Sequence, residues 1–163
     1  MSRAFVKEDG PEDTRLPDLP LSPHPNHVTP GGLARLQARL AAAQATLTAL
    51  RARADRLNRQ PEAVAAQEIR YLEARLRSAI PVTPASAPQE AAFGVAVTCT
   101  DTAGRTRTWR IVGEDEADPA LGLLSVRSPL ARALIGAAPG DKVEWPMGAK
   151  VVTLTVQSLS GDA

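Results

Sequence analysis

The feature that most constrains this chain is a heptad repeat that begins at Leu33. Apolar residues recur from there at alternating spacings of three and four, which lines them up along one side of an α-helix. The positions are Leu33, Leu36, Leu40, Ala43, Leu47, Leu50, Ala54 and Leu57. Thr29 is suited to cap such a helix, and Pro30 to occupy its first turn. The pattern predicts a helix from about residue 30 to 58.

A second seam follows and predicts a partner for this helix. The segment 58–61, Asn-Arg-Gln-Pro, interrupts the first helix because a residue before proline avoids the helical region. Apolar residues then recur in steps of four and three, at Ala65, Ile69, Leu72, Leu76 and Ala79. Two such seams joined by a short turn predict an antiparallel coiled-coil hairpin. Its first helix is the longer arm, so we expect it to overhang at the base against the C-terminal domain.

Charge and proline content divide the rest of the chain. The 163 residues carry a net charge of +1, but residues 1–28 are acidic and hold five prolines, whereas residues 29–79 hold nine arginines against four acids. A polar, proline-rich stretch buries too little apolar surface to offset its ordering entropy. We therefore predict four parts: an extended or disordered arm at 1–28, a hairpin at 29–80, a proline-containing linker at 81–91 and a C-terminal domain at 92–163.

The C-terminal domain has the alternating pattern of β-strands. Runs rich in Val and Thr predict strands at 94–101, 106–112, 122–126, 143–145 and 150–159. Ser128 and Pro129 open a short helix that Gly136 ends. The predicted fold class is therefore α+β, with one short helix on an antiparallel sheet.

Composition excludes several classes of protein. The near-neutral charge argues against a general nucleic-acid binder, and a single cysteine, Cys99, excludes a disulfide framework and a Cys-cluster zinc site. No apolar run approaches the length of a membrane span, and residues 1–10 lack the apolar stretch of a secretory signal. We expect a cytoplasmic protein. Cys99 should be a buried thiol, and Trp109 and Trp145 should lie in or beside the core.

Two groups of polar residues contain possible metal ligands, but neither has the composition and spacing of a metal site. His24 and His27 have no acidic or cysteine neighbour. The acidic residues after the second strand lack the spacing of a calcium loop, so we expect them to form an exposed loop. They are Glu114, Asp115, Glu116 and Asp118. No metal site of the protein's own is predicted.

Several stretches of the chain resemble the Gre-type transcription elongation factors, the GreA/GreB family. The closest likeness lies in Arg-Ile-Val-Gly-Glu-Asp-Glu-Ala-Asp at 110–118 and in Leu-Ser-Val-Arg-Ser-Pro-Leu-Ala-Arg-Ala-Leu-Ile-Gly at 124–136. Residues 28–33 are similar to the start of the family's first finger helix, and residues 93–97 to its first β-strand. Residues 2–9 and 22–26 look like the extra arm of a proteobacterial subgroup of Gre-like proteins.

The resemblance implies a fold and a partner. Gre factors join a coiled-coil hairpin to a C-terminal domain that is FK506-binding-protein-like in fold. That domain docks at the rim of the secondary channel of bacterial RNA polymerase, and the hairpin enters the channel. In cleavage-active members, two acidic tip residues help to hold a second Mg²⁺ in the polymerase active site, and this metal activates water to hydrolyse backtracked RNA. Such a protein is a regulator and not itself an enzyme, and it has no cofactor of its own.

The tip departs from the family pattern where that chemistry would occur. The family carries an Asp and a Glu three apart, whereas here Asp55 is followed at that spacing by Asn58. Arginines surround the position and repel a divalent cation: Arg51, Arg53, Arg56 and Arg59. The hairpin is also shorter than the family's finger, and a loss of two helical turns shortens its reach by roughly 11 Å. The chain is therefore identified with a Gre-like subgroup that has an N-terminal extension and a shortened, non-acidic tip.

The resemblance also implies a docking surface on the C-terminal domain. Its candidate polymerase-binding residues are Asp115, Glu116, Asp118, Ser128, Pro129 and Arg132. Helix capping alone already explains Ser128 and Pro129.

Three functions stay open at this point. The first is a monomeric RNA polymerase-binding regulator without strong cleavage stimulation, whose tip arginines meet acidic groups of the channel or phosphates of the nascent RNA. The second is a transcript cleavage factor in which Asp55 and Glu62 help to hold Mg²⁺ shared with the polymerase. The third is a binding module of the same fold for another partner.

Overall fold

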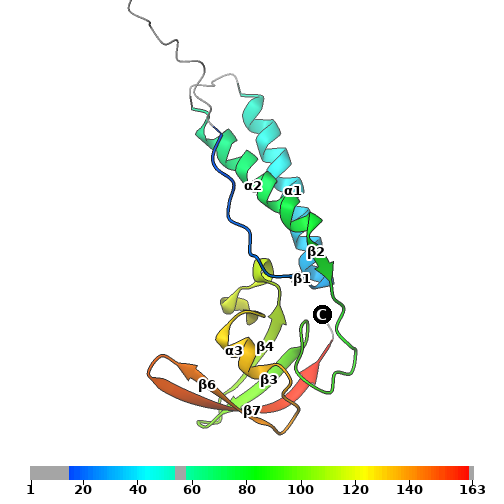
Figure 1. The fold of residues 1–163 in the computed structure, drawn as a ribbon, viewed down its shortest axis with the longest axis vertical. Coiled ribbons are helices and arrows are strands. Elements are labelled where there is room, and N and C mark those ends of the chain that lie inside the picture. Colours follow the sequence, from blue (N-terminus) through cyan, green and yellow to red (C-terminus); the bar gives the residue numbers. More distant parts are fainter. Residues whose placement is uncertain (1–14, 54–57, 162–163) are drawn as a thin grey trace, which may run out of the picture.

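The computed structural model describes residues 15–53 and 58–161. Two long helices stand above a small β-sheet domain, and an extended N-terminal segment lies along one of the helices (Figure 1). The helices are α1 (Pro30–Arg51) and α2 (Gln60–Arg77). The architecture is thus mixed α and β, as predicted.

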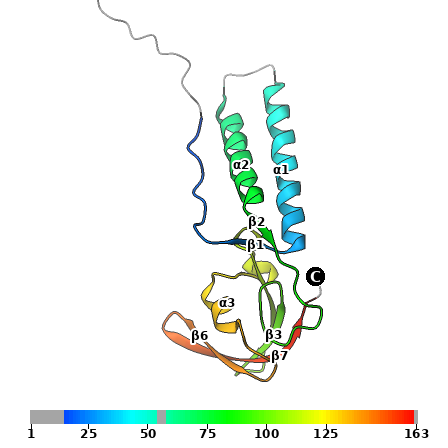
Figure 2. The same ribbon diagram turned by 45° about the vertical axis from the view of Figure 1, so that its right-hand side comes forward.

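The two helices lie side by side and run in opposite directions (Figure 2). Leu36, Ala43 and Leu72 are buried between them. The partly buried residues packed around these three are Leu33, Leu40, Ile69, Tyr71, Leu76 and Ala79. All of these except Tyr71 are predicted heptad positions. Thr29 caps α1 as predicted, because its Oγ1 accepts a hydrogen bond of 2.9 Å from the Gly32 N–H.

The predicted end of the first helix at residue 58 is wrong. The helix α1 has 22 residues and ends at Arg51, with Ala52 as its C-cap. The second helix has 18 residues and begins at Gln60, whose N–H donates to the side-chain oxygen of Asn58. Tertiary packing supplies most of a helix's stability. A helix that extends beyond the end of its partner gains no further packing, and this favours an earlier end than the heptad pattern predicts. The seam positions Ala54 and Leu57 lie outside the described residues.

The C-terminal domain is a five-stranded sheet in the order β5-β4-β3-β7-β6 with one short helix, α3 (Pro129–Leu134), that contacts β5 and β6. The strands are β3 (Ala96–Asp101), β4 (Thr106–Val112), β5 (Leu123–Ser125), β6 (Lys142–Met147) and β7 (Lys150–Ser160). Buried Val97, Ile111 and Leu134 belong to its core. Cys99 is buried there, and Trp109 and Trp145 pack against the core partly buried, as predicted.

One strand runs against the prediction of a wholly antiparallel sheet. β5 pairs with β4 in parallel, with Arg110 opposite Leu123 and Val112 opposite Ser125. The intervening residues 113–122 form two 3₁₀ turns, η1 (Glu114–Glu116) and η2 (Pro119–Leu121). They bring the chain back beside Arg110 before β5 begins, so the two strands point the same way.

The outer strand of the sheet, β6, carries a proline. β6 pairs only with β7, and Pro146 lies opposite Val151 near the end of the hairpin that joins them. Proline has no N–H to donate, which is why it is tolerated in edge strands.

The described part of the arm is extended, as predicted, and most of its side chains are exposed; Asn26 and Val28 at its end are buried. β1 (Asn26–Val28) pairs in parallel with β2 (Ala79–Pro81), and Val28 is fully buried. Residues 1–14 lie outside the described part of the chain. Within the described ranges, no helix is both long and apolar enough to cross a membrane.

Candidate functional site

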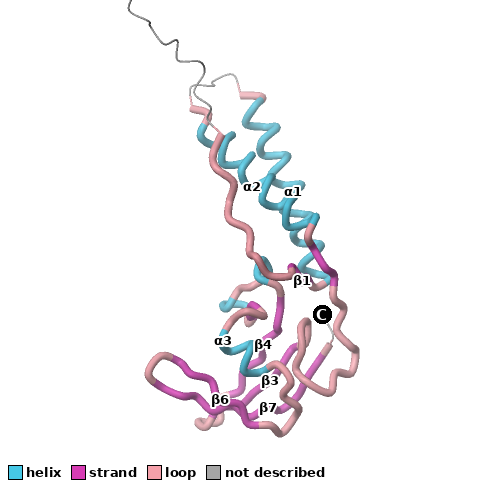
Figure 3. The backbone as a smooth tube through the Cα atoms, viewed as in Figure 1, coloured by secondary structure: helices cyan, strands magenta, loops and turns pink. Residues whose placement is uncertain are grey.

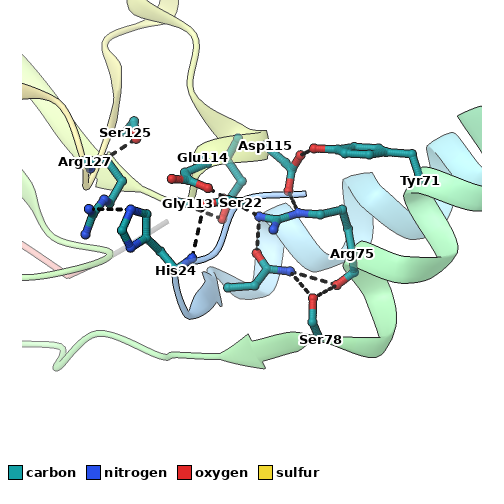
Figure 4. A network of polar contacts seen from close by, with 12 residues as sticks. Ser22, His24, Tyr71, Arg75, Ser78, Gly113, Glu114, Asp115, Ser125 and Arg127 are labelled. Atoms are coloured by element: carbon teal, nitrogen blue, oxygen red, sulfur yellow. Dashed lines mark hydrogen bonds and ion pairs between the residues drawn. The ribbon is translucent and has the colours of Figure 1, made fainter. Parts of the chain in front are cut away.

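The acidic segment Glu114–Glu116 lies under the base of the hairpin. Figure 4 shows Tyr71 and Arg75 of α2 directed at Asp115 from the side of the helices. The Glu116 and Asp115 side chains are only 1% and 7% exposed. The expectation of an exposed acidic loop is therefore wrong, because these carboxylates find partners in a part of the chain that is distant in sequence.

Glu116 holds the start of α1. One carboxylate oxygen accepts from the Thr29 N–H at 2.8 Å, and the other accepts from the Thr29 hydroxyl at 2.5 Å. The second oxygen also lies 3.3 Å from a guanidinium nitrogen of Arg35. Gly32 lies against the same carboxylate, so closely that a Cβ there would overlap the Glu116 side chain. The contact requires a glycine at this position of the helix.

Asp115 holds α2. One of its oxygens accepts from Arg75 Nε at 2.5 Å, and the other accepts from the Tyr71 hydroxyl, also at 2.5 Å. Burial, together with the hydrogen bond to Asp115, raises the pKa of Tyr71 to about 12. Tyr71 therefore keeps its proton over the physiological pH range and acts as a donor.

Arg75 joins this ion pair to the arm. Its side chain is 4% exposed. Nη2 donates to Asn26 Oδ1 at 2.6 Å, and Asn26 Nδ2 donates in return to the Arg75 carbonyl at 2.8 Å. A carboxylate oxygen of Glu114 lies 3.9 Å from Arg75 Nη2. Removing one member of a buried pair leaves an uncompensated charge, which typically costs about 3–5 kcal/mol. We call Asn26, Arg75, Asp115, Glu116 and Thr29 the junction.

The predicted docking residues fall into two groups. Asp115 and Glu116 belong to the junction, and Asp118 is half-buried and caps η2 by accepting from the Ala120 N–H at 3.0 Å. Ser128 caps α3 by accepting from the Ala131 N–H at 3.2 Å. The exposed candidates are Pro129 and Arg132. Contact of these residues with a partner stays a prediction.

A groove separates α1 from the segment around η1 and η2. It has a volume of about 260 Å³ and is lined on the helix side by Arg35 and Arg39, and on the other side by Asp115, Glu116 and Asp118. Leu121 forms part of its lining and is 73% exposed. The structure thus brings the three predicted acids to one side of a groove whose other side is basic.

The described residues at the hairpin tip are basic. Arg51, Arg53 and Arg59 are exposed, and so is Asn58, whose side-chain oxygen is already engaged at the start of α2. Glu62 is half-buried in the first turn of that helix. The candidates Asp55 and Arg56 lie outside the described residues. Over residues 15–53 and 58–161, no three His, Cys, Asp or Glu side chains gather as a metal site would require.

Sequence reasoning missed Asn26, Tyr71 and Arg75 as members of the site. Arg75 lies between the seam residues Leu72 and Leu76, where a charged residue is close to the buried side of the helix. That position signals a buried charge that needs a partner, but the partner is 40 residues away.

Residues 86–160 match the family described as "Transcription elongation factor, GreA/GreB, C-term". This is the family that the motifs at 110–118 and 124–136 resemble, and the match covers a little under half of the chain. Among curated relatives, the transcription elongation factor GreA of Cereibacter sphaeroides is 48% identical over 77 residues, which is 47% of this chain and 51% of that protein. GreA of Paracoccus denitrificans is 42% identical over 87 residues, covering 53% and 56%. The chain spans about half the length of the curated relatives it matches.

Two solved structures are similar at lower identity. The GreA factor homolog 1 (Gfh1) protein of Thermus thermophilus is 22% identical, with 83% of this chain and 99% of that chain covered and a TM-score of 0.40. The elongation factor GreA/GreB from Nitrosomonas europaea is 18% identical, with 84% and 98% covered and a TM-score of 0.41.

Proposed function

We propose that this protein is a regulator of transcription elongation that binds bacterial RNA polymerase. Its C-terminal domain, for which we expect the FK506-binding-protein-like fold, docks at the secondary channel, and the hairpin enters the channel as a coiled coil. The protein acts in the cytoplasm as a monomer and is not itself an enzyme. The observation that carries the proposal is the GreA/GreB match of residues 86–160, in a chain whose helical hairpin projects from that domain.

We further propose that the protein does not strongly stimulate transcript cleavage. The support is the tip, where the described side chains Arg51, Arg53 and Arg59 are exposed and basic. A divalent cation is repelled by such a surface, whereas acidic groups of the channel or phosphates of the nascent RNA are attracted. Asn58 stands where the cleavage-active pattern has a Glu, and its side-chain oxygen accepts a hydrogen bond from the Gln60 backbone.

A cleavage assay with competition tests the proposal. An elongation complex is halted in a backtracked register and incubated with the protein and Mg²⁺, with and without a cleavage-active Gre factor. We expect no shortening of the RNA by this protein alone and slower shortening by the Gre factor in its presence. Shortening that Asp55→Ala or Glu62→Ala abolishes would establish the cleavage factor instead, with a carboxylate that shares Mg²⁺ with the polymerase.

Direct binding to core polymerase provides the second readout. The triple variant Arg51→Gln, Arg53→Gln, Arg59→Gln should bind more weakly. A matched triple variant of the C-terminal domain, Arg105→Gln, Arg107→Gln, Lys150→Gln, removes the same charge far from the tip. Equal weakening by both would indicate non-specific attraction. No binding of the unaltered protein would favour a module for another partner.

A further inference from the structure

The described arm, residues 15–28, follows α2 from the base of the hairpin toward its tip (Figure 3). Arg70 binds it twice, with Nη2 donating to the Leu16 carbonyl at 2.7 Å and Nε donating to Asp18 Oδ1 at 2.5 Å. Gln67 donates to the Pro17 carbonyl at 2.6 Å. Side chains of α2 therefore hold the backbone of the arm, which is a contact that hydrophobic patterning does not detect.

The same segment also contacts the C-terminal domain. A ring nitrogen of His24 lies 2.7 Å from Arg127 Nη2 (Figure 4). The ring centroids of His27 and Phe93 lie 5.8 Å apart. The His27 carbonyl approaches Gly113 so closely that a Cβ at Gly113 would overlap it. The arm thus touches the hairpin on one side and the sheet domain on the other.

Asn26 lies where these two sets of contacts meet. It is 5% exposed, and its amide both accepts from and donates to Arg75, whose guanidinium is also bound to Asp115. Its Nδ2 lies 3.2 Å from the Ser78 hydroxyl as well. One side chain of the arm therefore binds both the backbone at the end of α2 and the guanidinium that reaches Asp115 of the C-terminal domain.

Only one covalent connection joins the hairpin to the sheet domain, the segment between β2 and β3. A single connecting chain leaves two bodies free to change their relative direction, unless non-covalent contacts hold them. Besides the direct contacts of Asp115 and Glu116 with the helices, the arm supplies a further attachment, since it contacts both α2 and the sheet domain. Prolines 17, 20, 23 and 25 restrict its backbone, which lowers the entropy it loses on docking.

We propose that the arm segment 15–28 sets the direction in which the hairpin points relative to the C-terminal domain, with Asn26 as the positioning residue. The inference goes beyond the proposed function, because it holds whatever partner receives the hairpin.

Distances between two spin labels in the isolated protein test this inference directly. The labels are placed at the exposed positions Ala45 of α1 and Ala103 of the turn after β3, each changed to Cys. The background carries Cys99→Ala, so that only the introduced thiols react. We expect one narrow distance distribution for the unaltered arm. Asn26→Ala should broaden it at least twofold, whereas the matched substitution Asn58→Ala at the other end of the hairpin should leave it unchanged.

A second variant guards against simple misfolding. Removal of residues 1–21 deletes the contacts with Gln67 and Arg70 but leaves β1 and the buried junction in place. We expect a broadened distribution with unchanged helical circular dichroism. Narrow distributions in both folded variants would overturn the inference. So would a broad distribution in the protein with its arm intact.

The polymerase assay then separates this inference from the proposed function. If one tenth of the Asn26→Ala molecules point the hairpin in the productive direction, apparent affinity falls about tenfold. Failure of the unaltered protein to bind polymerase would reject the proposed function and leave the spin-label result standing. If Asn26→Ala keeps its affinity for polymerase although its distance distribution is broadened, then binding does not depend on the direction of the hairpin. That result would overturn a role for Asn26 in positioning the hairpin for its partner.

Discussion

The two ends of the helical hairpin use charge in opposite ways. At the base, Arg75 and Asp115 are almost completely buried and bound to each other. At the tip, Arg51, Arg53 and Arg59 are exposed to solvent. Buried charges are committed to the fold because they cannot lose a partner cheaply, whereas exposed charges remain available to a partner. The contrast indicates that the acidic segment serves the architecture of this chain, and it is consistent with the recognition role proposed for the arginines.

The largest effect on this contrast should come from Arg75→Ala. It leaves Asp115 buried without its cation, so we expect a loss of about 3–5 kcal/mol in the free energy of unfolding. Urea denaturation followed by circular dichroism measures it. The control Arg77→Ala changes an exposed arginine on the same helix and should cost no more than about 0.5 kcal/mol. Similar losses for both variants would remove the distinction.

Alanine substitutions at the two neighbouring glycines at the start of α1 should change the stability of the protein in opposite directions. Gly32→Ala forces a methyl group into the Glu116 carboxylate, and overpacking of this kind costs about 1–3 kcal/mol. Gly31→Ala meets only ordinary contacts of 3.8 Å or more, so it should stabilise by up to about 1 kcal/mol through its lower unfolded-state entropy. Thermal unfolding of the pair compares them. Stabilisation by Gly32→Ala would show that the Glu116 contact yields easily.

Alkaline pH should weaken the base of the hairpin through Tyr71. Because its pKa in the folded protein is raised to about 12 from the usual 10, the stability it contributes is complete below pH 10 and is lost as the pH rises toward 12. Burial likewise raises the pKa of Cys99 to about 11, so the comparison is made in a Cys99→Ala background. Unfolding free energies measured from pH 9 to 11.5 should fall less steeply for Tyr71→Phe. Parallel slopes would contradict the assignment.

The smallest effect on stability is expected at the tip. The triple variant Arg51→Gln, Arg53→Gln, Arg59→Gln changes exposed side chains, so its free energy of unfolding should stay within about 1 kcal/mol of the unaltered protein. The same denaturation experiment measures it. A loss comparable to that of Arg75→Ala would mean that the tip, too, is structural.

Local patterns allowed much of the fold to be predicted. The heptad seams, the Thr29 and Ser128 caps and the strand pattern of the C-terminal domain depend on neighbours within a few residues, and the structure agrees with them. The parallel pairing of β5 was missed because it is decided by the path of residues 113–122, which has no periodicity.

The site was harder to predict than the fold. The acidic segment looks solvated when only its own sequence is considered, and its burial depends on partners from the arm and both helices. The arm is extended, as predicted, but its contact with α2 was missed, because apolar content gives no sign of carbonyl groups, such as those of Leu16 and Pro17, that are bound by side chains of a helix. Long-range polar pairs of this kind leave no spacing signal in a single sequence.

Pro146 affects how readily this protein can aggregate through its β-sheet. An open sheet edge invites another chain to add a strand, which is a common route to aggregation. Lys142, Glu144 and Pro146 place charges and a missing donor on the outer strand of this sheet. A strand added at this edge could not form a continuous ladder of backbone hydrogen bonds, because Pro146 has no N–H. It would also have to pack beside the charged side chains of Lys142 and Glu144. These features disfavour the addition of a strand from another molecule at the β6 edge, even though the apolar side chains of Met147 and Val151 there are exposed.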